Sequence, residues 1–160
     1  MDMSDSLLLR KVTRADIPFI TSSWLESFRN APMVRGVPNS IYFSYHHKIL
    51  EELLPRSIVL VACNPADTDQ IVGYICAEVF DNCLVVHYVY VKQPLRRLGV
   101  AKKLLDTLLE SEKPAAVQYT AKTPSIFDFE KQLKEQRIIY NPYLLYATLP
   151  EGWDDGQEGR

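Results

Sequence analysis

The sequence has few cysteines and no long apolar run. Its three cysteines, Cys63, Cys76 and Cys83, are odd in number and show no CxxC spacing. This pattern predicts neither a disulfide framework nor a zinc site. No segment approaches the roughly 18 apolar residues of a membrane span, and the N-terminal apolar run is too short for a signal peptide. We therefore expect a cytoplasmic protein without membrane association.

The chain also lacks an excess of charge of either sign. It carries 18 basic and 20 acidic residues, for a formal net charge of -2. This balance gives no broad electrostatic footprint for DNA, RNA or anionic lipid, so general nucleic-acid binding is not expected. Both common phosphate loops, GxxxxGK[ST] and GxGxxG, are absent from the sequence. A nucleoside triphosphatase and a Rossmann dehydrogenase are therefore disfavoured.

What is present is the pattern of one α+β domain. The length of 160 residues with 47% hydrophobic content fits a single domain over 1–150, with a disordered tail at 151–160. Hydrophobic periodicity predicts strands at 7–12, 58–63, 71–80, 83–91, 116–121 and 143–148, and helices at 17–28, 41–53, 99–113 and 125–136. The expected order is β-α-α-β-β-β-α-β-α-β, around a mixed and mostly antiparallel sheet.

Local signals set several of these boundaries. Thr13 and Asp16 resemble a capping box at the start of the first helix. The second helix is expected to be capped by Asn39 or Ser40 and to stop before Pro55. The two-residue connection at 81–82 predicts a tight turn between antiparallel strands.

One strand-to-helix junction indicates an anion site. Arg96 and Arg97 precede Gly99, and a Lys-bearing amphipathic helix follows. A helix N-terminus offers main-chain N–H groups and the positive end of a dipole, and Gly99 lets a phosphate approach the backbone closely. The alternative is an ordinary turn with solvated arginines.

The same segment resembles a known family motif. VKQPLRRLGVA, residues 91–101, is similar to the acetyl-CoA signature of the GCN5-related N-acetyltransferases (GNAT), which is Arg/Gln-x-x-Gly-x-Gly/Ala after an apolar strand residue. LLLRKVTRADI resembles the family's opening strand and helix, and DQIVGYICAEVF its third strand. The resemblance covers nearly the whole chain.

This resemblance implies a GNAT-like sheet that is splayed between its fourth and fifth strands. Acetyl-CoA would be the co-substrate, with pantetheine between these strands and pyrophosphate at the motif. A bulge in the fourth strand would aim a main-chain N–H near Tyr90 or Val91 at the thioester carbonyl. The implied cofactor-binding residues are Val89, Tyr90, Val91, Arg96, Arg97, Leu98, Gly99, Val100, Ala101 and Lys102.

The implied reaction is acetyl transfer to a primary amine by direct attack on the thioester, which requires a base. His87 is the first candidate, because an imidazole suits proton transfer at neutral pH, and strand parity places it on the face of Val89 and Val91 until any bulge. The alternative is a buried structural histidine. Glu78 is the competing base, although a solvent-facing position is favoured for it.

The family's usual acid, a tyrosine on the helix after the fifth strand, has no counterpart in TPSIFDFEKQLKEQ. Tyr140 is the chosen substitute, with Tyr119, Tyr143, Tyr146 and water as alternatives. A catalytically silent CoA-binding regulatory or interaction module is the alternative function, and the missing tyrosine is its main support.

The acceptor site should come from the first two helices and their linker. Its candidate residues are Arg29, Tyr42, Tyr45 and His46. This segment contains no acidic cluster, which disfavours polyamines and aminoglycosides. Adjacent His46 and His47 point about 100° apart on a helix, so no metal site is expected. The expected partner is an amine on a small molecule, a protein or a modified base, and a homodimer is compatible with the sequence.

Overall fold

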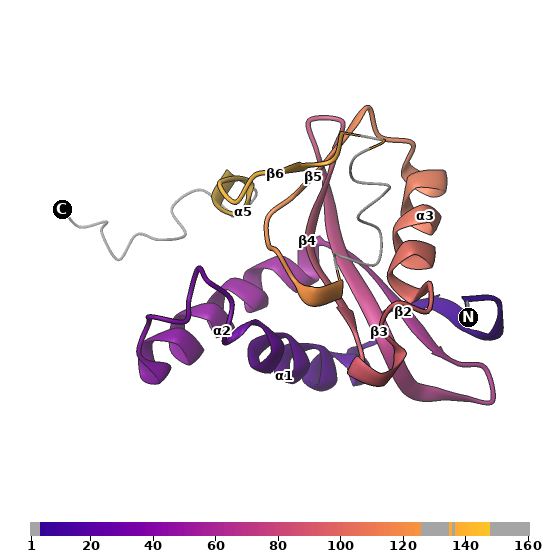
Figure 1. Ribbon diagram of the computed structural model, residues 1–160, viewed down its shortest axis with the longest axis horizontal. Coiled ribbons are helices and arrows are strands. Elements are labelled where there is room, and N and C mark those ends of the chain that lie inside the picture. The colour runs from indigo at the N-terminus through magenta and orange to yellow at the C-terminus, as the bar shows by residue number, and fades with distance from the viewer. Residues whose placement is uncertain (1–3, 126–134, 136, 148–160) are drawn as a thin grey trace.

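The computed structural model describes residues 4–125, 135 and 137–147, and it shows a six-stranded mixed sheet with helices on both faces (Figure 1). The strands are β1 (Leu8–Lys11), β2 (Ile58–Asn64), β3 (Asp67–Phe80), β4 (Cys83–Val91), β5 (Ala116–Tyr119) and β6 (Ile139–Tyr140). The helices are α1 (Ile17–Phe28), α2 (Asn39–Arg56), α3 (Val100–Glu112) and the single turn α5 (Leu144–Ala147). The predicted α+β class is confirmed.

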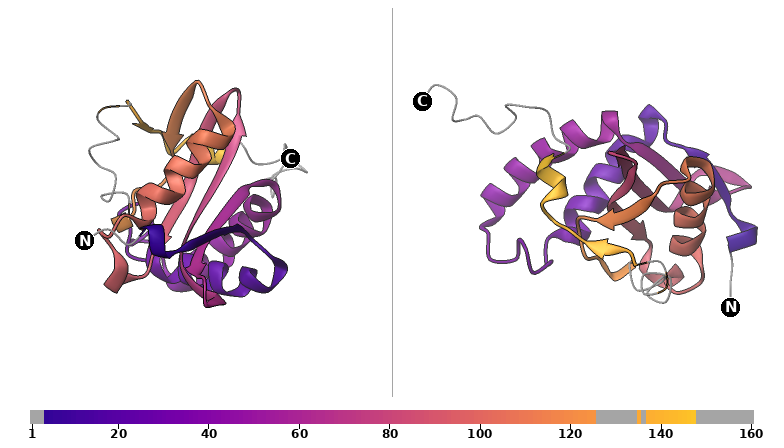
Figure 2. Two further views of the ribbon diagram at one scale, coloured as in Figure 1. Left: turned by 90° about the vertical axis from the view of Figure 1, so that its right-hand side faces the viewer. Right: turned by 90° about the horizontal axis from the view of Figure 1, so that it is seen from above.

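The sheet divides the core into two layers. Strands β1 to β4 pair antiparallel in sequence order, whereas β5 pairs parallel to both β4 and β6. Helices α1 and α2 cover one face and α3 covers the other (Figures 1 and 2). Alternate residues of the central strands fill each layer, because successive side chains of a strand point to opposite faces.

The predicted capping box and the predicted hairpin turn are both confirmed. The Thr13 main-chain N–H and hydroxyl both donate to the Asp16 carboxylate, at 2.7 and 3.0 Å. The Arg10 guanidinium binds the same carboxylate and lowers the pKa of Asp16 to about 2. Asp81 and Asn82 have φ values of 53° and 59°, the left-handed pair that a two-residue type I′ hairpin requires.

The parting of β4 and β5 is also confirmed. β5 pairs with β4 over Cys83 to Val86, and the Thr120 N–H donates the next bond, to the Val86 carbonyl at 3.0 Å. From His87 onward the two strands diverge. The Thr123 hydroxyl reaches across this gap to the Val89 carbonyl, at 3.2 Å.

A bulge lies within β4. Cys76 of β3 faces Tyr88, whereas the next residue, Ala77, faces Val86. His87 is therefore the extra residue of a β-bulge. The predicted bulge in this strand is therefore present, three residues before Tyr90, and it coincides with the point where β5 leaves β4.

This bulge corrects the predicted strand parity. Val89 and Val91 belong to the core layer under α3, whereas Tyr88 belongs to the layer under α1 and α2. His87 lines a cavity on the α1 and α2 side. The shared face that strand parity gave to His87, Val89 and Val91 was expected only in the absence of a bulge, and the extra residue at His87 reverses the alternation.

Helix α2 extends further than predicted at both ends. It begins at Asn39 with Pro38 in the capping position, so the predicted caps Asn39 and Ser40 are wrong. It also continues through Pro55 to Arg56. Proline in the last turn removes only one main-chain hydrogen bond from the helix end, so it does not stop the helix where a mid-helix proline would.

The predicted final strand at 143–148 is wrong. β6 takes the edge of the sheet four residues earlier, at Ile139–Tyr140, and residues 144–147 form helix α5. Asn141 starts this helical turn, since its side-chain oxygen accepts the Tyr143 N–H and its carbonyl accepts the Leu144 N–H. The predicted helix at 125–136 lies largely outside the described residues.

Replacing Gly73 by alanine should destabilise the protein. A Cβ at Gly73 would lie 2.7 Å from the main-chain oxygen of Tyr90, which cannot move without shifting β4. We expect the free energy of unfolding in urea to fall by about 1–3 kcal/mol. Gly36→Ala is the matched control, because no atom lies within 4 Å of its added Cβ. Equal effects of the two substitutions would contradict this account.

Candidate active site

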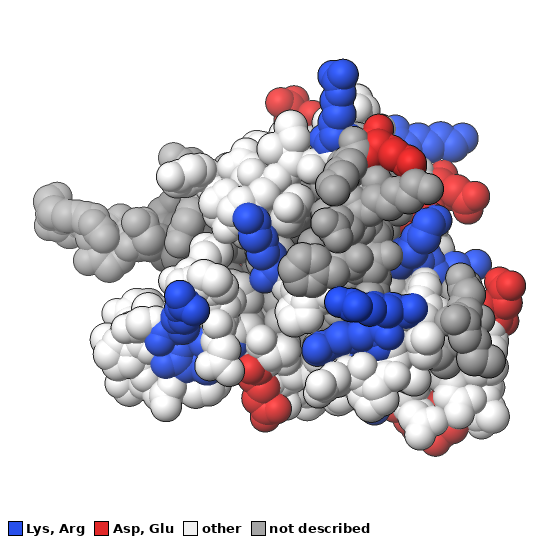
Figure 3. Space-filling view, in the orientation of Figure 1, with Lys and Arg blue, Asp and Glu red and all other residues white. Residues whose placement is uncertain are grey.

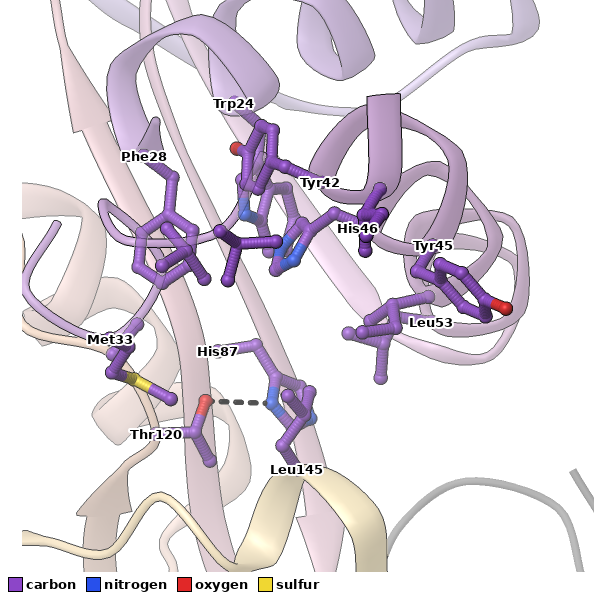
Figure 4. Close-up of a pocket in the computed structure, with 15 residues that line it drawn as sticks. Trp24, Phe28, Met33, Tyr42, Tyr45, His46, Leu53, His87, Thr120 and Leu145 are labelled. Carbon is purple, nitrogen blue, oxygen red and sulfur yellow. Dashed lines mark hydrogen bonds between the residues drawn. The ribbon is translucent and has the colours of Figure 1, made fainter. Parts of the chain in front are cut away.

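A cavity of about 180 Å³ lies between the helices α1 and α2 and the point where β4 and β5 part. Trp24 and Tyr42 contribute from the helices, and His87 and Thr120 from the sheet side (Figure 4). Leu145 of α5 lies beside His87 and forms part of the same wall of the cavity. The cavity therefore brings together residues that are more than a hundred positions apart in the chain.

A chain of hydrogen bonds runs away from this cavity. His87 Nδ1 lies 3.1 Å from the Thr120 hydroxyl, and His87 Nε2 lies 3.0 Å from Glu78 Oε1. The second Glu78 oxygen accepts from Arg56 Nε at 3.2 Å. His87 is only 1% exposed and Glu78 9%. The prediction that Glu78 faces solvent is therefore wrong, because Arg56 at the end of α2 lies against it.

The chemistry of these groups assigns the imidazole tautomer. An ionised carboxylate accepts hydrogen bonds only, and an arginine on its other oxygen favours the ionised form. Nε2 of His87 therefore carries the proton that is shared with Glu78. Nδ1 is left as an acceptor, and the Thr120 hydroxyl donates to it. The result is a hydroxyl, an imidazole and a carboxylate in series.

Three of the four predicted acceptor residues line the cavity, namely Tyr42, Tyr45 and His46. Burial raises the pKa of Tyr42 to about 12 and lowers the pKa of His46 to about 4. Both side chains are therefore uncharged at neutral pH. The Tyr42 hydroxyl donates to the Leu25 carbonyl at 2.7 Å, which fixes the Tyr42 ring in the wall.

The fourth predicted acceptor residue, Arg29, is not among the residues that line the cavity. Its guanidinium donates to the Asn39 side chain and to the carbonyls of Val34 and Val37. It also lies 4.9 Å from the centre of the Tyr42 ring. Arg29 therefore holds the linker between α1 and α2 in place.

The predicted anion site lies at the start of α3. Gly99 is the capping residue with φ 89°, and Arg97 is also left-handed with φ 66°. The Lys103 N–H donates to the Gly99 carbonyl at 3.0 Å, so Val100 and Ala101 belong to the first turn, whose N–H groups point out of the helix end. Lys and Arg side chains gather over the loop between β4 and α3 (Figure 3).

Two predicted cations of this region have contacts within the chain. Arg96 Nε donates to the Val91 carbonyl at 3.0 Å, which ties the motif loop to the end of β4. Lys102 Nζ lies 2.5 Å from Asp106 one turn along α3. Arg96 has five N–H donors in all, so this contact uses one part of its guanidinium.

The direction of the main-chain N–H groups in β4 shows which of the predicted thioester contacts face the gap between β4 and β5. The Lys92 N–H donates to the Val72 carbonyl, and the antiparallel ladder alternates from there. The main-chain N–H groups of Val89 and Val91 consequently point away from β3, into the gap. The N–H of Tyr90 points the other way, toward Tyr74 of β3. Val91 and Val89 are thus better placed than Tyr90 to meet a ligand between β4 and β5.

The candidate acid Tyr140 is not among the residues that line the cavity, but it contacts one of them. Its hydroxyl contacts Met33 Sδ at 3.5 Å, and Met33 lines the cavity. The Tyr140 ring also lies 5.4 Å from the Tyr119 ring, and Lys122 Nζ lies 4.7 Å from its centre. Tyr143 is strongly exposed. The side chain of Tyr146 lies outside the described residues.

Sequence reasoning missed Thr120 and Arg56 as site residues. Thr120 is the last residue but one of the 116–121 run and matches no motif. Arg56 looks in the sequence like an ordinary basic residue in the last turn of a helix. Their roles depend on neighbours 33 and 22 positions away in sequence, His87 and Glu78. In the described part of the chain there is no cluster of three or more His, Cys, Asp or Glu side chains suited to a metal.

Comparison with known proteins gives one family and many similar folds. Residues 20–122 match the model of the acetyltransferase (GNAT) family. No curated protein matches the chain. Within the described residues, no helix has both the length and the apolar character needed to cross a membrane.

Three solved structures illustrate the likeness. The PaiA N-acetyltransferase of Thermoplasma acidophilum, in complex with coenzyme A, is 17% identical, with TM-score 0.58 over 79% of this chain and 87% of that one. The ribosomal-protein-alanine N-acetyltransferase of Brucella melitensis biovar Abortus 2308 is 16% identical, with TM-score 0.53 over 82% and 90%. An aminoglycoside acetyltransferase from an uncultured soil metagenomic sample, in complex with sisomicin, is 20% identical, with TM-score 0.53 over 83% and 90%.

Proposed function

The chain belongs to the acetyltransferase (GNAT) family, and on this premise we propose that it transfers an acetyl group from acetyl-CoA to a primary amine. The observation that carries this proposal is the series Thr120, His87 and Glu78 beside the gap between β4 and β5. The matched family region contains all three residues. A hydroxyl, imidazole and carboxylate in series can move a proton, which amine acetylation requires.

The residues around the gap suit the co-substrate. Gly99 holds a left-handed conformation at the start of α3, where a Cβ would add strain and crowd an approaching phosphate. The N–H groups of Val89 and Val91 face the gap, where a thioester carbonyl needs donors. Acetyl-CoA would supply an acyl thioester there. The proposed contacts are Val89, Val91 and residues 96–102.

The proposed proton path starts at the amine. An alkylammonium has a pKa of about 10.4 and no free lone pair, so it must lose a proton before it attacks. As the amine nitrogen bonds to the thioester carbon, its N–H proton passes to the Thr120 oxygen while the Thr120 proton passes to His87 Nδ1. Glu78, held by Arg56, stabilises the imidazolium that forms.

The second proton transfer of the reaction is to the leaving group. When the carbon–sulfur bond breaks, the CoA sulfur departs as a thiolate. We assign Tyr140 as the proton donor, because its hydroxyl lies against Met33 of the cavity wall. The alkylammonium has released its first proton to solvent before the attack, so the net products are an amide, CoA thiol and that one proton. His87 then returns the second amine proton to solvent, and the Tyr140 phenolate takes one up, which restores both side chains.

The fold alone leaves the kind of amine open. One similar structure carries an aminoglycoside acetyltransferase's name and another a ribosomal-protein-alanine acetyltransferase's, so the same fold serves different acceptors. A homodimer and a cytoplasmic location stay predictions. The acceptor of this chain has to be inferred from its own cavity.

A thiol-release assay with acetyl-CoA and a panel of primary amines tests the proposal, alongside calorimetric binding of acetyl-CoA. We expect turnover with at least one amine, and Gly99→Val should weaken acetyl-CoA binding about tenfold or more. Ile139→Val, at an exposed edge-strand position, is the control that should bind normally. Binding without turnover for every amine would favour a regulatory CoA-binding module, and no binding would refute both functions.

A further inference from the structure

The cavity beside His87 has an unusual lining for an amine site. Among the described residues that line it there is no Asp or Glu. Its walls are aromatic rings and aliphatic side chains, with imidazole and hydroxyl groups as the polar members. A polycationic acceptor requires several carboxylates to replace its lost hydration, and these walls do not provide them.

The size of the cavity limits the acceptor further. Its volume is about 180 Å³. An apolar cavity of about 150 Å³ accommodates a benzene molecule. The enclosed space therefore fits one six-membered ring with a short chain.

The rings in the wall suit a flat, uncharged group of the acceptor. His46 lies 5.3 Å from the Tyr42 ring at an interplanar angle of 20°, and 5.1 Å from the Phe28 ring. Burial lowers the pKa of His46 to about 4, so this side of the cavity carries no positive charge at neutral pH. Aromatic faces and edges attract a planar aromatic group more than a saturated one of equal size.

The polarity of the cavity orients the acceptor. Among its lining residues Met33, Ile41 and Tyr45 are exposed, whereas His87 and Thr120 are buried. In Figure 4 His46 and His87 approach the cavity from opposite sides, and the hydrogen bond between Thr120 and His87 lies on the sheet side. A ring that fills the space between the helices and the sheet would direct a short amine-bearing chain toward Thr120.

We propose that the acceptor is a compact aromatic primary amine, with its ring held between α1, α2 and the sheet and its amino group beside Thr120. This inference rests on the proposed function, because it names the acceptor of that same reaction. The ring provides the binding energy, and the short chain sets the distance from the ring to the amine that is acetylated.

The test compares 2-phenylethylamine with ethylamine and spermidine in the thiol-release assay. We expect kcat/KM for 2-phenylethylamine to exceed that for each of the other two amines by about tenfold or more, because only this amine buries an aromatic ring in the cavity. Binding of 2-phenylethanol, which lacks the reactive amine, is measured separately by ligand-observed NMR.

Two tryptophan substitutions on α2 locate the site. Ile41 lines the cavity and is 47% exposed, while Phe43 is 41% exposed and is not among the lining residues. Ile41→Trp should raise KM for 2-phenylethylamine about tenfold and weaken 2-phenylethanol binding similarly. Phe43→Trp, with comparable exposure on the same helix, should change neither value.

The outcomes separate this inference from the proposed function. Binding of 2-phenylethanol that is sensitive to Ile41→Trp, without turnover of any amine, would support the ligand class and refute acetyl transfer. Equal or faster turnover of ethylamine or spermidine would overturn the ligand class and leave acetyl transfer standing. If 2-phenylethanol bound equally well to the Ile41→Trp variant, the proposed location of the ring in this cavity would be overturned.

Discussion

Replacing His87 by glutamine is expected to lower kcat by about 10²- to 10³-fold while acetyl-CoA binds as before. Glutamine can donate to Glu78 and accept from Thr120, so it preserves the two hydrogen bonds of the imidazole. It cannot take up a proton at neutral pH. Stopped-flow or steady-state thiol release gives kcat, and calorimetry gives the dissociation constant of acetyl-CoA.

Thr120 provides the control that distinguishes proton transfer from packing. Thr120→Val keeps the shape and removes the hydroxyl, so it should lower kcat by a factor comparable to that of the glutamine variant. Thr120→Ser restores the hydroxyl and should recover most of the rate. Full activity of both His87→Gln and Thr120→Val would show that this histidine is structural and that the base lies elsewhere.

Trp24→Ala should produce the largest loss of stability, about 3–5 kcal/mol in the free energy of unfolding. Trp24 is only 3% exposed, and its ring stacks on the Tyr88 ring with 4.5 Å between centres and 7° between planes. Its removal would leave a void that joins the existing cavity. Denaturant unfolding, followed by far-UV circular dichroism, measures the change.

Trp24→Phe is the graded control. A phenyl ring keeps part of the stacking on Tyr88, so its loss should be less than half that of the alanine variant. If alanine at position 24 changes stability by less than about 1 kcal/mol, the layer between α1 and the sheet does not depend on this ring.

The hairpin of β3 and β4 could be predicted from the local sequence alone. The run 83–91 matches β4 at both ends, and the turn before it needs two residues that tolerate a left-handed backbone, which Asp81 and Asn82 do. These signals concern neighbours a few positions apart. The prediction at 143–148 failed because the β propensity of YLLYAT competed with the turn that Asn141 begins, and the sheet edge was already taken by Ile139–Tyr140.

Single residues of the candidate site were predicted from the sequence, but their contacts with one another were not. His87 stood out as a lone ionisable residue in an apolar run, and Gly99 as a glycine at a helix start. The position of Glu78 was predicted wrongly, because a carboxylate on an otherwise apolar strand is usually solvent-facing. Its burial depends on Arg56, which arrives from a different helix.

The sequence by itself determined the family motif, the order of the elements as far as β5 and the polar residues available for chemistry, since each of these follows from local pattern and spacing. Only the tertiary structure decided how those residues combine. One extra residue in β4 turns His87 toward α1 and α2, and the parting of β5 places Thr120 against it. A bulge and a strand divergence depend on pairing between distant segments, so no local pattern encodes them.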